Sequence, residues 1–521
     1  MQSNCTRLAS SRVVCVTDRS LILALDQGTS SSRTAIVDRH GRLISVAQKE
    51  FKQFFPKSGW VEHDASEIWT TQLETAHQAL RLGGISDNQI AGIGITNQRE
   101  TIVVWDRKSG KPIHHALVWQ DRRTAGDLEH LRAQGVEAKV TEKTGLLLDP
   151  YFSASKLAWI LNNVDGARVS AQRGELAAGT IDSWLIWNLT GGKLHVTDVS
   201  NASRTMLMDL KTLEWDEWLM KLFNIPQGIL PKIVDSSGVC GETDTSIFGR
   251  AIPIAGIGGD QQCALFGQSC TQAGMSKTTF GTGCFLLANI GTQLIQSRSR
   301  FLTTVAWRMK GAPAMYALEG SVFMGGASIQ WLRDGLGIIR SAPEVNELAA
   351  SVADSDGVVV VPAFTGLGAP HWDATARGAI LGLTRGTTAA HIARATLEGI
   401  AMRVVEVFEA MKADIPSVDR DESIGIMRVD GGACASDLLM QMQADLLGIH
   451  VERPAILEST VLGAAYLAGL ATGVWTSVKE IESLRRVDRV FAPMMSPSTR
   501  VAMRERWRKA IEKSRGWEEQ P

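Results

Sequence analysis

Alternating stretches of apolar and polar residues predict a β-hairpin near the start of the chain. An apolar run of strand length begins at Leu21 and ends at Asp26, and a second apolar run starts at Thr34. Gly28 lets the backbone turn between them. We therefore expect residues 21–37 to form a tight hairpin, to which residues 41–46 add a third antiparallel strand.

The same periodicities predict mixed helices and strands along the rest of the chain. Helical spacing predicts helices at residues 64–82, 155–162, 183–189, 209–223, 320–332, 390–413, 436–447 and 459–472. Strands are expected at 90–96, 358–362 and 451–453, and strands that run into glycine turns at 252–262 and 427–433. Residues 276–288 repeat the plan of the first hairpin, which indicates two similar α/β lobes that face a shared cleft.

Length suggests how these elements are divided. A chain of 521 residues exceeds what one hydrophobic core usually serves. We expect two domains, at residues 21–270 and 271–521. Residues 1–20 carry several arginines and lack the apolar core of a signal peptide, so we expect a disordered extension there.

Charge and cysteine usage narrow the class of partner. The formal net charge is −1, from 54 basic and 55 acidic residues, which gives no electrostatic footprint for nucleic acid or an anionic membrane. No apolar run reaches the length of a transmembrane helix, so no stable membrane insertion is expected. Seven scattered cysteines fit reduced thiols. These features favour a cytoplasmic protein that acts on small molecules.

The turn of the first hairpin has the residue types of a phosphate and Mg²⁺ site. Its amides and hydroxyls can converge on an anion, and Arg33 adds a fixed positive fork. Asp26 stands at the carboxyl end of a buried strand, where α/β sheets hold ligands, and a carboxylate beside phosphates usually serves a divalent cation. The alternative is an ordinary Gly/Ser turn with a solvated aspartate.

Two further stretches have the residue types of a polyol site. Arg99 and Glu100 follow a buried strand, where they form either a surface ion pair or a donor and an acceptor that clamp a polyol. Asp260 stands at the exit of a glycine turn, where a carboxylate can accept a hydroxyl proton. Trp119 and Tyr151 lie beside polar residues and fit either the core or such a site.

The double glycine that follows Asp430 leaves a turn without side chains, against which an adenine ring can lie. Neither Gly-x-x-x-x-Gly-Lys-Ser/Thr nor Gly-x-Gly-x-x-Gly occurs in the sequence. A nucleotide site in this chain must therefore differ from both the P-loop and the Rossmann dinucleotide site.

Taken together, these motifs resemble the FGGY carbohydrate kinase family, and most closely its members that phosphorylate glycerol. The match runs in order from about residue 21 to residue 517. It rests on the motifs at residues 25–33, 97–101, 259–262, 280–285, 323–331 and 429–433.

The resemblance implies an α/β fold of two ribonuclease H-like (actin-like ATPase) domains with the active site between them. It implies ATP-dependent phosphorylation of glycerol to sn-glycerol 3-phosphate, with Mg²⁺ as cofactor, by a homodimer or homotetramer. The implied metal ligands are Asp26 and Asp260, and Asp260 is also the implied catalytic base. The implied glycerol site comprises Arg99, Glu100, Trp119, Tyr151, Asp260, Gln261 and Phe285. The implied nucleotide site comprises Thr29, Ser30, Ser31, Arg33, Thr282, Gly326, Gln330, Gly432 and Ser436.

The chain departs from the family pattern at three places. Ser436 replaces the usual asparagine near the adenine, and His371 replaces a usual tyrosine. Residues 236–250 lack both the Gly/Arg-rich segment expected for fructose 1,6-bisphosphate inhibition and the phosphorylatable histidine of some relatives. We therefore expect neither control.

Two alternatives to glycerol phosphorylation remain at this point. One is another FGGY kinase, acting on a pentulose or gluconate, which would need a wider and more polar pocket than Trp119, Tyr151 and Phe285 suggest. The other is an actin-like protein that uses ATP to change shape or assemble.

Overall fold

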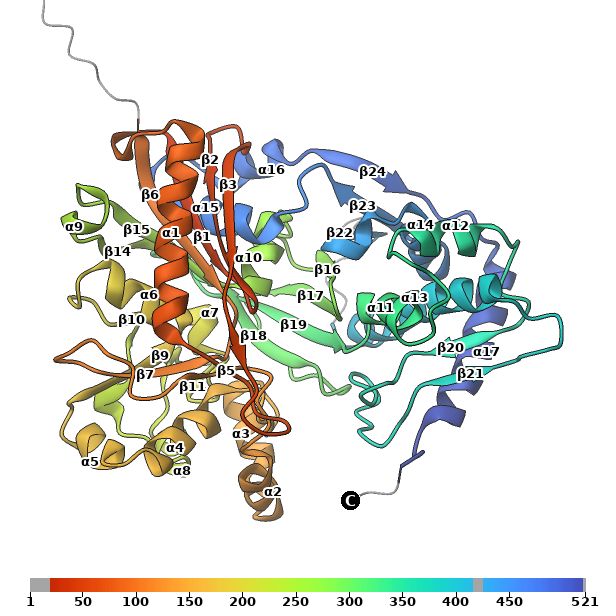
Figure 1. Cartoon of the computed structure of the whole chain (residues 1–521), viewed down its shortest axis with the longest axis horizontal. Helices are drawn as coiled ribbons and strands as arrows, with labels where there is room; N and C mark the ends of the chain where they lie inside the picture. The colour runs from red at the N-terminus through yellow and green to blue at the C-terminus, as the bar shows by residue number, and fades with distance from the viewer. Residues whose placement is uncertain (1–18, 416–424, 519–521) are drawn as a thin grey trace, which may run out of the picture.

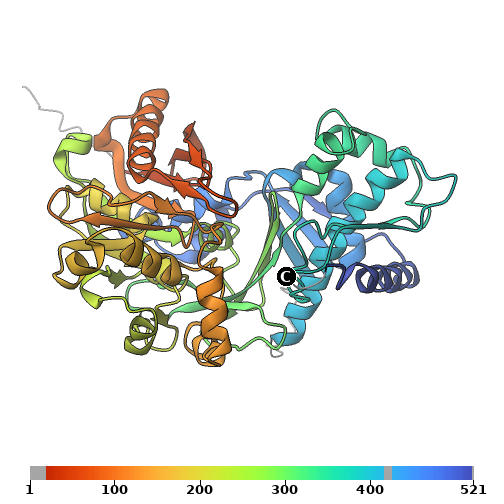
Figure 2. The same cartoon turned by 60° about the horizontal axis from the view of Figure 1, so that its bottom comes forward.

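The computed structural model describes residues 19–415 and 425–518. They form two lobes, one built largely from the red to yellow segments of Figure 1 and the other largely from the green to blue ones (Figures 1 and 2). Apart from Arg19 and Ser20, the extension expected at residues 1–20 lies outside the described residues. Within the described ranges, no helix combines the length and the apolarity needed to cross a bilayer.

The N-terminal lobe is built on a six-stranded sheet. Its strands lie in the spatial order β14 (Ser237–Glu242), β15 (Pro253–Gly259), β6 (Ile90–Asn97), β1 (Leu21–Gln27), β2 (Ser31–Val37) and β3 (Leu43–Glu50). The predicted hairpin is present: β1 and β2 pair antiparallel, and β3 continues the meander. Because β1, β6 and β15 run parallel, their carboxyl ends meet at one edge of the sheet.

The C-terminal lobe contains a second sheet with the same core arrangement. Its strands lie in the order β18 (Leu302–Trp307), β19 (Met315–Val322), β17 (Cys284–Gly291), β16 (Ser276–Phe280), β22 (Ile426–Asp430), β23 (His450–Pro454) and β24 (Val487–Phe491). β16 pairs antiparallel with β17 and parallel with β22, as β1 does with β2 and β6. The repeat in the sequence therefore corresponds to two hairpins in equivalent places.

Helices and smaller sheets complete both lobes. The N-terminal lobe adds the five-stranded sheet β4 (Gln53–Phe54), β5 (Glu62–His63), β8 (Ala116–Leu117), β7 (Ile102–Asp106) and β9 (Leu176–Thr180), and the short pair β10 (Val196–Asp198) and β13 (Lys232–Val234). Its helices include α1 (Ala65–Gly83), α2 (Ala125–Ala133), α3 (Glu137–Thr144), α4 (Ser153–Asn163), α5 (Ala167–Gln172), α6 (Ile181–Leu189), α7 (Val199–Ala202), α9 (Thr245–Phe248) and α10 (Asp260–Gly267). The later helices are α11 (Gly326–Asp334), α12 (Glu344–Ala350), α13 (Ala389–Asp414), α14 (Asp437–Leu447), α15 (Ser459–Thr472), α16 (Val478–Leu484) and α17 (Pro497–Ser514), beside the strand pair β20 (Val359–Val361) and β21 (Ala379–Leu381).

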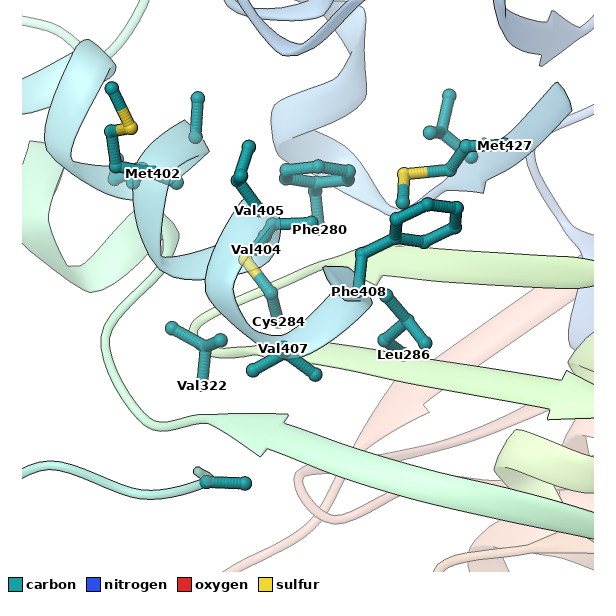
Figure 3. Packing of buried hydrophobic residues seen from close by; sticks show 14 of the residues in the cluster. Phe280, Cys284, Leu286, Val322, Met402, Val404, Val405, Val407, Phe408 and Met427 are labelled. Carbon is teal, nitrogen blue, oxygen red and sulfur yellow. The ribbon is translucent and has the colours of Figure 1, made fainter. Parts of the chain in front are cut away.

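The long helix α13 supplies much of the C-terminal core. The apolar side of this helix is buried, as its helical spacing predicts, and Figure 3 shows Val404, Val407 and Phe408 beside strand residues such as Phe280 and Leu286. This packing fixes the sheet that carries the second hairpin turn.

Two predicted helices differ from the structure. Residues 209–223 form a short hairpin, β11 (Met208–Asp209) with β12 (Glu214–Trp215), and only then the helix α8 (Glu217–Leu222). The aspartate at position 216 caps α8, which explains why the helix begins there. The helix predicted at 320–332 begins at Gly326, because residues up to Val322 belong to β19 and pair with β17.

Helix α15, from the C-terminal half of the chain, packs against the N-terminal lobe. It packs against α10 and against the strands β1, β6 and β15. The approach to α10 is close enough to need glycine: a Cβ on Gly463 would lie 1.8 Å from the carbonyl oxygen of Cys263, and one on Gly267 would lie 1.9 Å from that of Ser459. These are backbone contacts, which a rotamer change cannot relieve.

Replacing Gly463 by alanine should therefore destabilise the protein. We expect Gly463→Ala to lower the free energy of unfolding by about 1–3 kcal/mol, the usual cost of overpacking. A shift of the urea midpoint to lower concentration measures it. Gly126→Ala is the matched control, because an added Cβ there meets nothing within 4 Å; an equal loss in both variants would contradict this explanation.

Candidate functional site

Strand register brings the predicted acidic and basic residues together. Asp26 lies opposite Thr96 of β6, and Gly259 of β15 lies opposite Asn97. The parallel strands β1, β6 and β15 therefore end side by side. Asp26 is the penultimate residue of β1, and Arg99 and Asp260 follow β6 and β15 at the same edge. This edge is the usual position of a ligand site in an α/β sheet.

Asp26 lies in a site that disfavours its negative charge. Its pKa is raised to about 7, chiefly by burial and also by the nearby carboxylates of Glu458 and Asp260, while the charge of Arg33 opposes the rise. Arg33 itself is ion-paired with Glu458, which precedes α15, and donates from Nε to Gln48 Oε1 at 3.1 Å. Arg33 thus lies near Asp26, but the carboxylate of Glu458, just before α15, holds it.

Arg99 is buried at the centre of an ionic cluster. Its Nε lies 3.0 Å from Asp260 Oδ1, and it forms a two-pronged ion pair with Glu319 of β19, in which Nη2 donates to Oε1 at 3.0 Å. Arg99 Nη2 also lies 3.4 Å from the hydroxyl of Tyr151. Because Arg99 is 3% exposed and Glu100 is 1% exposed, they are not a surface ion pair.

Glu100 faces a second buried arginine, Arg204, which none of the sequence motifs contains. Arg204 Nε donates to Glu100 Oε1 at 2.6 Å, and Arg204 Nη2 donates to Glu319 Oε1 at 3.1 Å. Glu100 also has a left-handed backbone with φ of 63°, which is uncommon for a residue that is not glycine. The two arginines hold the pKa of Glu319 down at about 2, whereas burial raises that of Glu100.

Two aromatic rings line the cluster. Trp119 and Tyr151 meet edge to face, with ring centroids 5.5 Å apart and planes at 80°. The Trp119 indole donates to Thr29 Oγ1 at 3.0 Å, which joins this wall to the first hairpin turn. Lys156, buried in α4, donates to the carbonyl oxygens of residues 150, 151 and 152 at 2.7–2.9 Å and so fixes the segment that carries Tyr151.

Asp260 is the first residue of α10. The backbone N–H of Gln261 donates to Asp260 Oδ1 at 2.7 Å. Burial raises the pKa of Asp260, and the charge of Arg99 opposes that rise. Lys277 of β16 donates to Gln261 Oε1 at 2.5 Å, so the residue after Asp260 contacts the second lobe.

The predicted nucleotide residues of the C-terminal lobe gather around the second hairpin turn. The carbonyl oxygen of Thr282 accepts from the N–H groups of Gly325 and Ala327 at 2.8 and 3.1 Å, which ties the turn to the start of α11. A Cβ on Gly326 would lie 4.0 Å from that of Ala433, so the two glycine turns are neighbours. Gln330 is exposed on α11, and a Cβ on Gly432 would meet nothing within 4 Å.

Ser436 caps helix α14 through its hydroxyl oxygen, which accepts from the N–H of Leu439 at 3.0 Å. The same hydroxyl donates to Asn346 of α12. At this position the serine has a local structural role whether or not it touches a base.

The structure also brings to the site three charged residues that were not predicted from the sequence. Arg204, Glu319 and Lys277 come from three different segments, and each is a fully buried charged residue. Only their residue type could have indicated them. A lysine or glutamate inside a buried strand is rare unless it is ion-paired or takes part in binding or catalysis.

Comparison with known proteins defines the class. Residues 21–267 match the N-terminal domain of the FGGY family of carbohydrate kinases, and residues 276–472 match its C-terminal domain. The chain belongs to this family. It is an enzyme, a carbohydrate kinase with a nucleotide substrate, and its fold of two ribonuclease H-like, actin-like ATPase domains is confirmed.

Within the family, curated glycerol kinases match over nearly the whole chain. The chain is 58% identical over 500 residues to the glycerol kinase of Rhodopirellula baltica, covering 96% of this chain and 92% of that one. It is 55% identical over 504 residues to that of Deinococcus radiodurans, covering 97% and 99%. The crystal structure of Plasmodium falciparum glycerol kinase with ADP superposes with a TM-score of 0.89 at 36% identity, covering 95% and 98%.

Proposed function

We propose that this enzyme transfers the γ-phosphoryl group of ATP to glycerol and forms sn-glycerol 3-phosphate. The observation that carries the proposal is the buried cluster in which Arg99 contacts both Asp260 and Glu319, beside the aromatic wall of Trp119 and Tyr151. Charged hydrogen-bonding groups on one side and rings on the other suit a small polyol, whose hydroxyls and carbons need different surroundings. The identity with glycerol kinases supports the same substrate.

Asp260 is the catalytic base in this proposal. A hydroxyl is a poor nucleophile, so Asp260 accepts its proton as the oxygen attacks the γ-phosphorus in line and the bond to ADP breaks. Arg99, Glu100, Tyr151 and Gln261 hold the hydroxyls, and Trp119 and Phe285 pack against the carbons. The hydroxyls of Thr29, Ser30, Ser31 and Thr282, together with Arg33, hold the phosphates, and Gly326, Gln330, Gly432 and Ser436 border the nucleoside.

The acidic residues at the sheet edge suit Mg²⁺. Asp26 is a carboxylate whose charge is poorly compensated, and Asp260 lies close enough to affect its pKa. Magnesium is typically bound by one or two carboxylates together with waters and substrate phosphates. When bound, the ion would neutralise charge on the phosphate oxygens, with Asp26 and Asp260 as its protein ligands.

A panel of substrates tests the proposal. We expect kcat/KM for glycerol to exceed that for xylulose or gluconate by at least about 100-fold. The longer carbon chain of these sugars would run into the buried Arg204 and Glu319 and break the hydrogen bonds between them. Initial rates of ADP release at matched ATP measure it. A preference for xylulose or gluconate would assign the enzyme to another branch of the family.

Fructose 1,6-bisphosphate should leave the activity unchanged. Residues 236–250 carry one arginine, Arg250, which donates to the backbone carbonyls of Asp87 and Ala251 at 2.9 and 3.0 Å rather than facing a free anion site. A titration of the bisphosphate against glycerol-dependent ADP release checks this, and saturable inhibition would contradict it. The domain bounds, a cytoplasmic location and a homodimer or homotetramer remain part of the proposal.

A further inference from the structure

Lys277 is a buried lysine in the middle of β16. Its side chain is among the largest fully buried ones in the described residues. The ammonium donates to Gln261 Oε1 at 2.5 Å and to Thr279 Oγ1 at 2.6 Å. Both acceptors are neutral oxygens. Because an ammonium group carries three protons, these two bonds leave one donor for another group.

The pleat of the second sheet places Lys277 on the face that borders the site. Residues two apart in a strand share a face, so Lys277 and Thr279 point the same way. The register pairs Thr279 with Phe285 and with Asp430, and it connects Lys277 through Leu287 to Glu319. The Glu319 carboxylate on this face contacts Arg99. The Lys277 ammonium therefore lies on the side of the sheet that faces α10 and the ionic cluster around Arg99.

Lys277 also reaches across to the other lobe. Its partner Gln261 follows Asp260 directly on α10. Burial lowers the pKa of Lys277, while Asp430 and Asp260 are close enough to raise it. A buried cation that donates only to neutral oxygens is costly, and such groups are retained where their charge is used. An anion brought to this place by a substrate would complete its bonding.

We propose that Lys277 is a catalytic residue whose ammonium contacts the phosphoryl group in transit. This inference rests on the proposed function. The bond from the γ-phosphorus to the ADP oxygen breaks, the bond to the glycerol oxygen forms, and the hydroxyl proton passes to Asp260. Lys277 keeps its protons throughout and offsets the charge spread over the equatorial oxygens. Its place beside Gln261 puts the positive charge next to the base, where the new bond forms.

Lys277→Met tests the inference, because methionine keeps much of the buried volume and removes the charge. We expect kcat with glycerol and Mg·ATP to fall by about 100- to 1,000-fold, as for other groups aimed at a transition state. The KM for glycerol should stay within about threefold, because the contact forms with the transferred group. Methylamine added to the assay should restore part of kcat. A lysine that only positions Gln261 would instead raise the KM for glycerol and gain nothing from methylamine.

Lys143→Met is the matched control, because Lys143 pairs with Asp209 and Asp216 away from the site and should leave kcat within about twofold. If Lys277→Met does not fold by circular dichroism, Lys277→Gln replaces it with the same expected loss of kcat. If the wild-type enzyme phosphorylates glycerol and folded Lys277→Met keeps a kcat within about threefold of it, the role of Lys277 is overturned but the proposed function is not. Wild-type enzyme that does not phosphorylate glycerol would overturn the proposed function.

Discussion

Asp260→Asn should lower kcat with glycerol by about 1,000- to 10,000-fold while the protein stays folded. The substitution keeps the size of the side chain and its position at the start of α10, but an amide cannot accept the hydroxyl proton. Loss of the negative charge also removes the partner of Arg99 Nε at 3.0 Å. Steady-state rates of ADP release with saturating glycerol and Mg·ATP measure the loss.

The pH profile gives an independent check on Asp260. Its folded pKa is raised from the ordinary value by burial, and the base acts only when deprotonated. The wild-type kcat/KM should therefore rise with pH through that pKa. Asp260→Asn should lose the part of this acidic limb that Asp260 contributes, while the part from Asp26, whose pKa is about 7, should stay. Asp244→Asn, a change at the half-buried N-cap of α9, should match the wild type. Retention of more than a tenth of the wild-type kcat by Asp260→Asn would show that the base lies elsewhere.

Asp26→Asn should abolish most activity and make the ligand-free protein more stable. The activity falls, by about 100-fold or more, because the proposed Mg²⁺ ligand loses its charge. The stability rises because the folded pKa of Asp26, about 7, exceeds its unfolded value, so at pH 8 the ionised carboxylate disfavours the folded state. This destabilisation disappears completely only when the pH falls below the pKa of Asp26 in the unfolded chain. Since the side chain is partly accessible, we expect a Tm gain of about 2–4 °C at pH 8.

Asp38→Asn separates the two effects. Asp38 follows the same hairpin, but its carboxylate accepts from the N–H groups of His40 and Arg42 and from Arg42 Nε at 2.8–3.0 Å. These bonds lower its pKa, so its charge stabilises the fold. We expect Asp38→Asn to lower Tm at pH 8 and to leave kcat nearly unchanged. If Asp26→Asn instead lowers Tm, the charge of Asp26 is well compensated in the folded protein. That result would contradict our reason for proposing Asp26 as a metal ligand.

The hairpins and the edge at which Asp26, Arg99 and Asp260 meet were predictable from the sequence. Strand ends marked by glycine and polar residues carry local signals, and parallel strands bring such ends together without further information. The helix predicted at residues 209–223 starts too early. The tryptophans at 215 and 218 have helical spacing, but the pairing of β11 with β12 and the cap at Asp216 delay the helix to residue 217.

The partners within the site were not predictable in the same way. Glu319 pairs with Arg99, which is 220 positions away in the chain, and Arg33 with Glu458, 425 positions away. Such pairs depend on how the two lobes are placed, for which a single sequence has no local signal. Lys277 was visible as a lysine within an expected strand, but its contact with Gln261 depends on the same placement of the lobes.

The most direct test of the account follows product and co-product together. Purified enzyme is mixed with Mg·ATP, with and without glycerol, while ADP release is recorded by a coupled assay and sn-glycerol 3-phosphate by a stereospecific dehydrogenase. We predict one glycerol 3-phosphate for each ADP and a basal ATPase at least about 100-fold slower. ADP release that glycerol does not accelerate, or that forms no glycerol 3-phosphate, would contradict the proposed reaction.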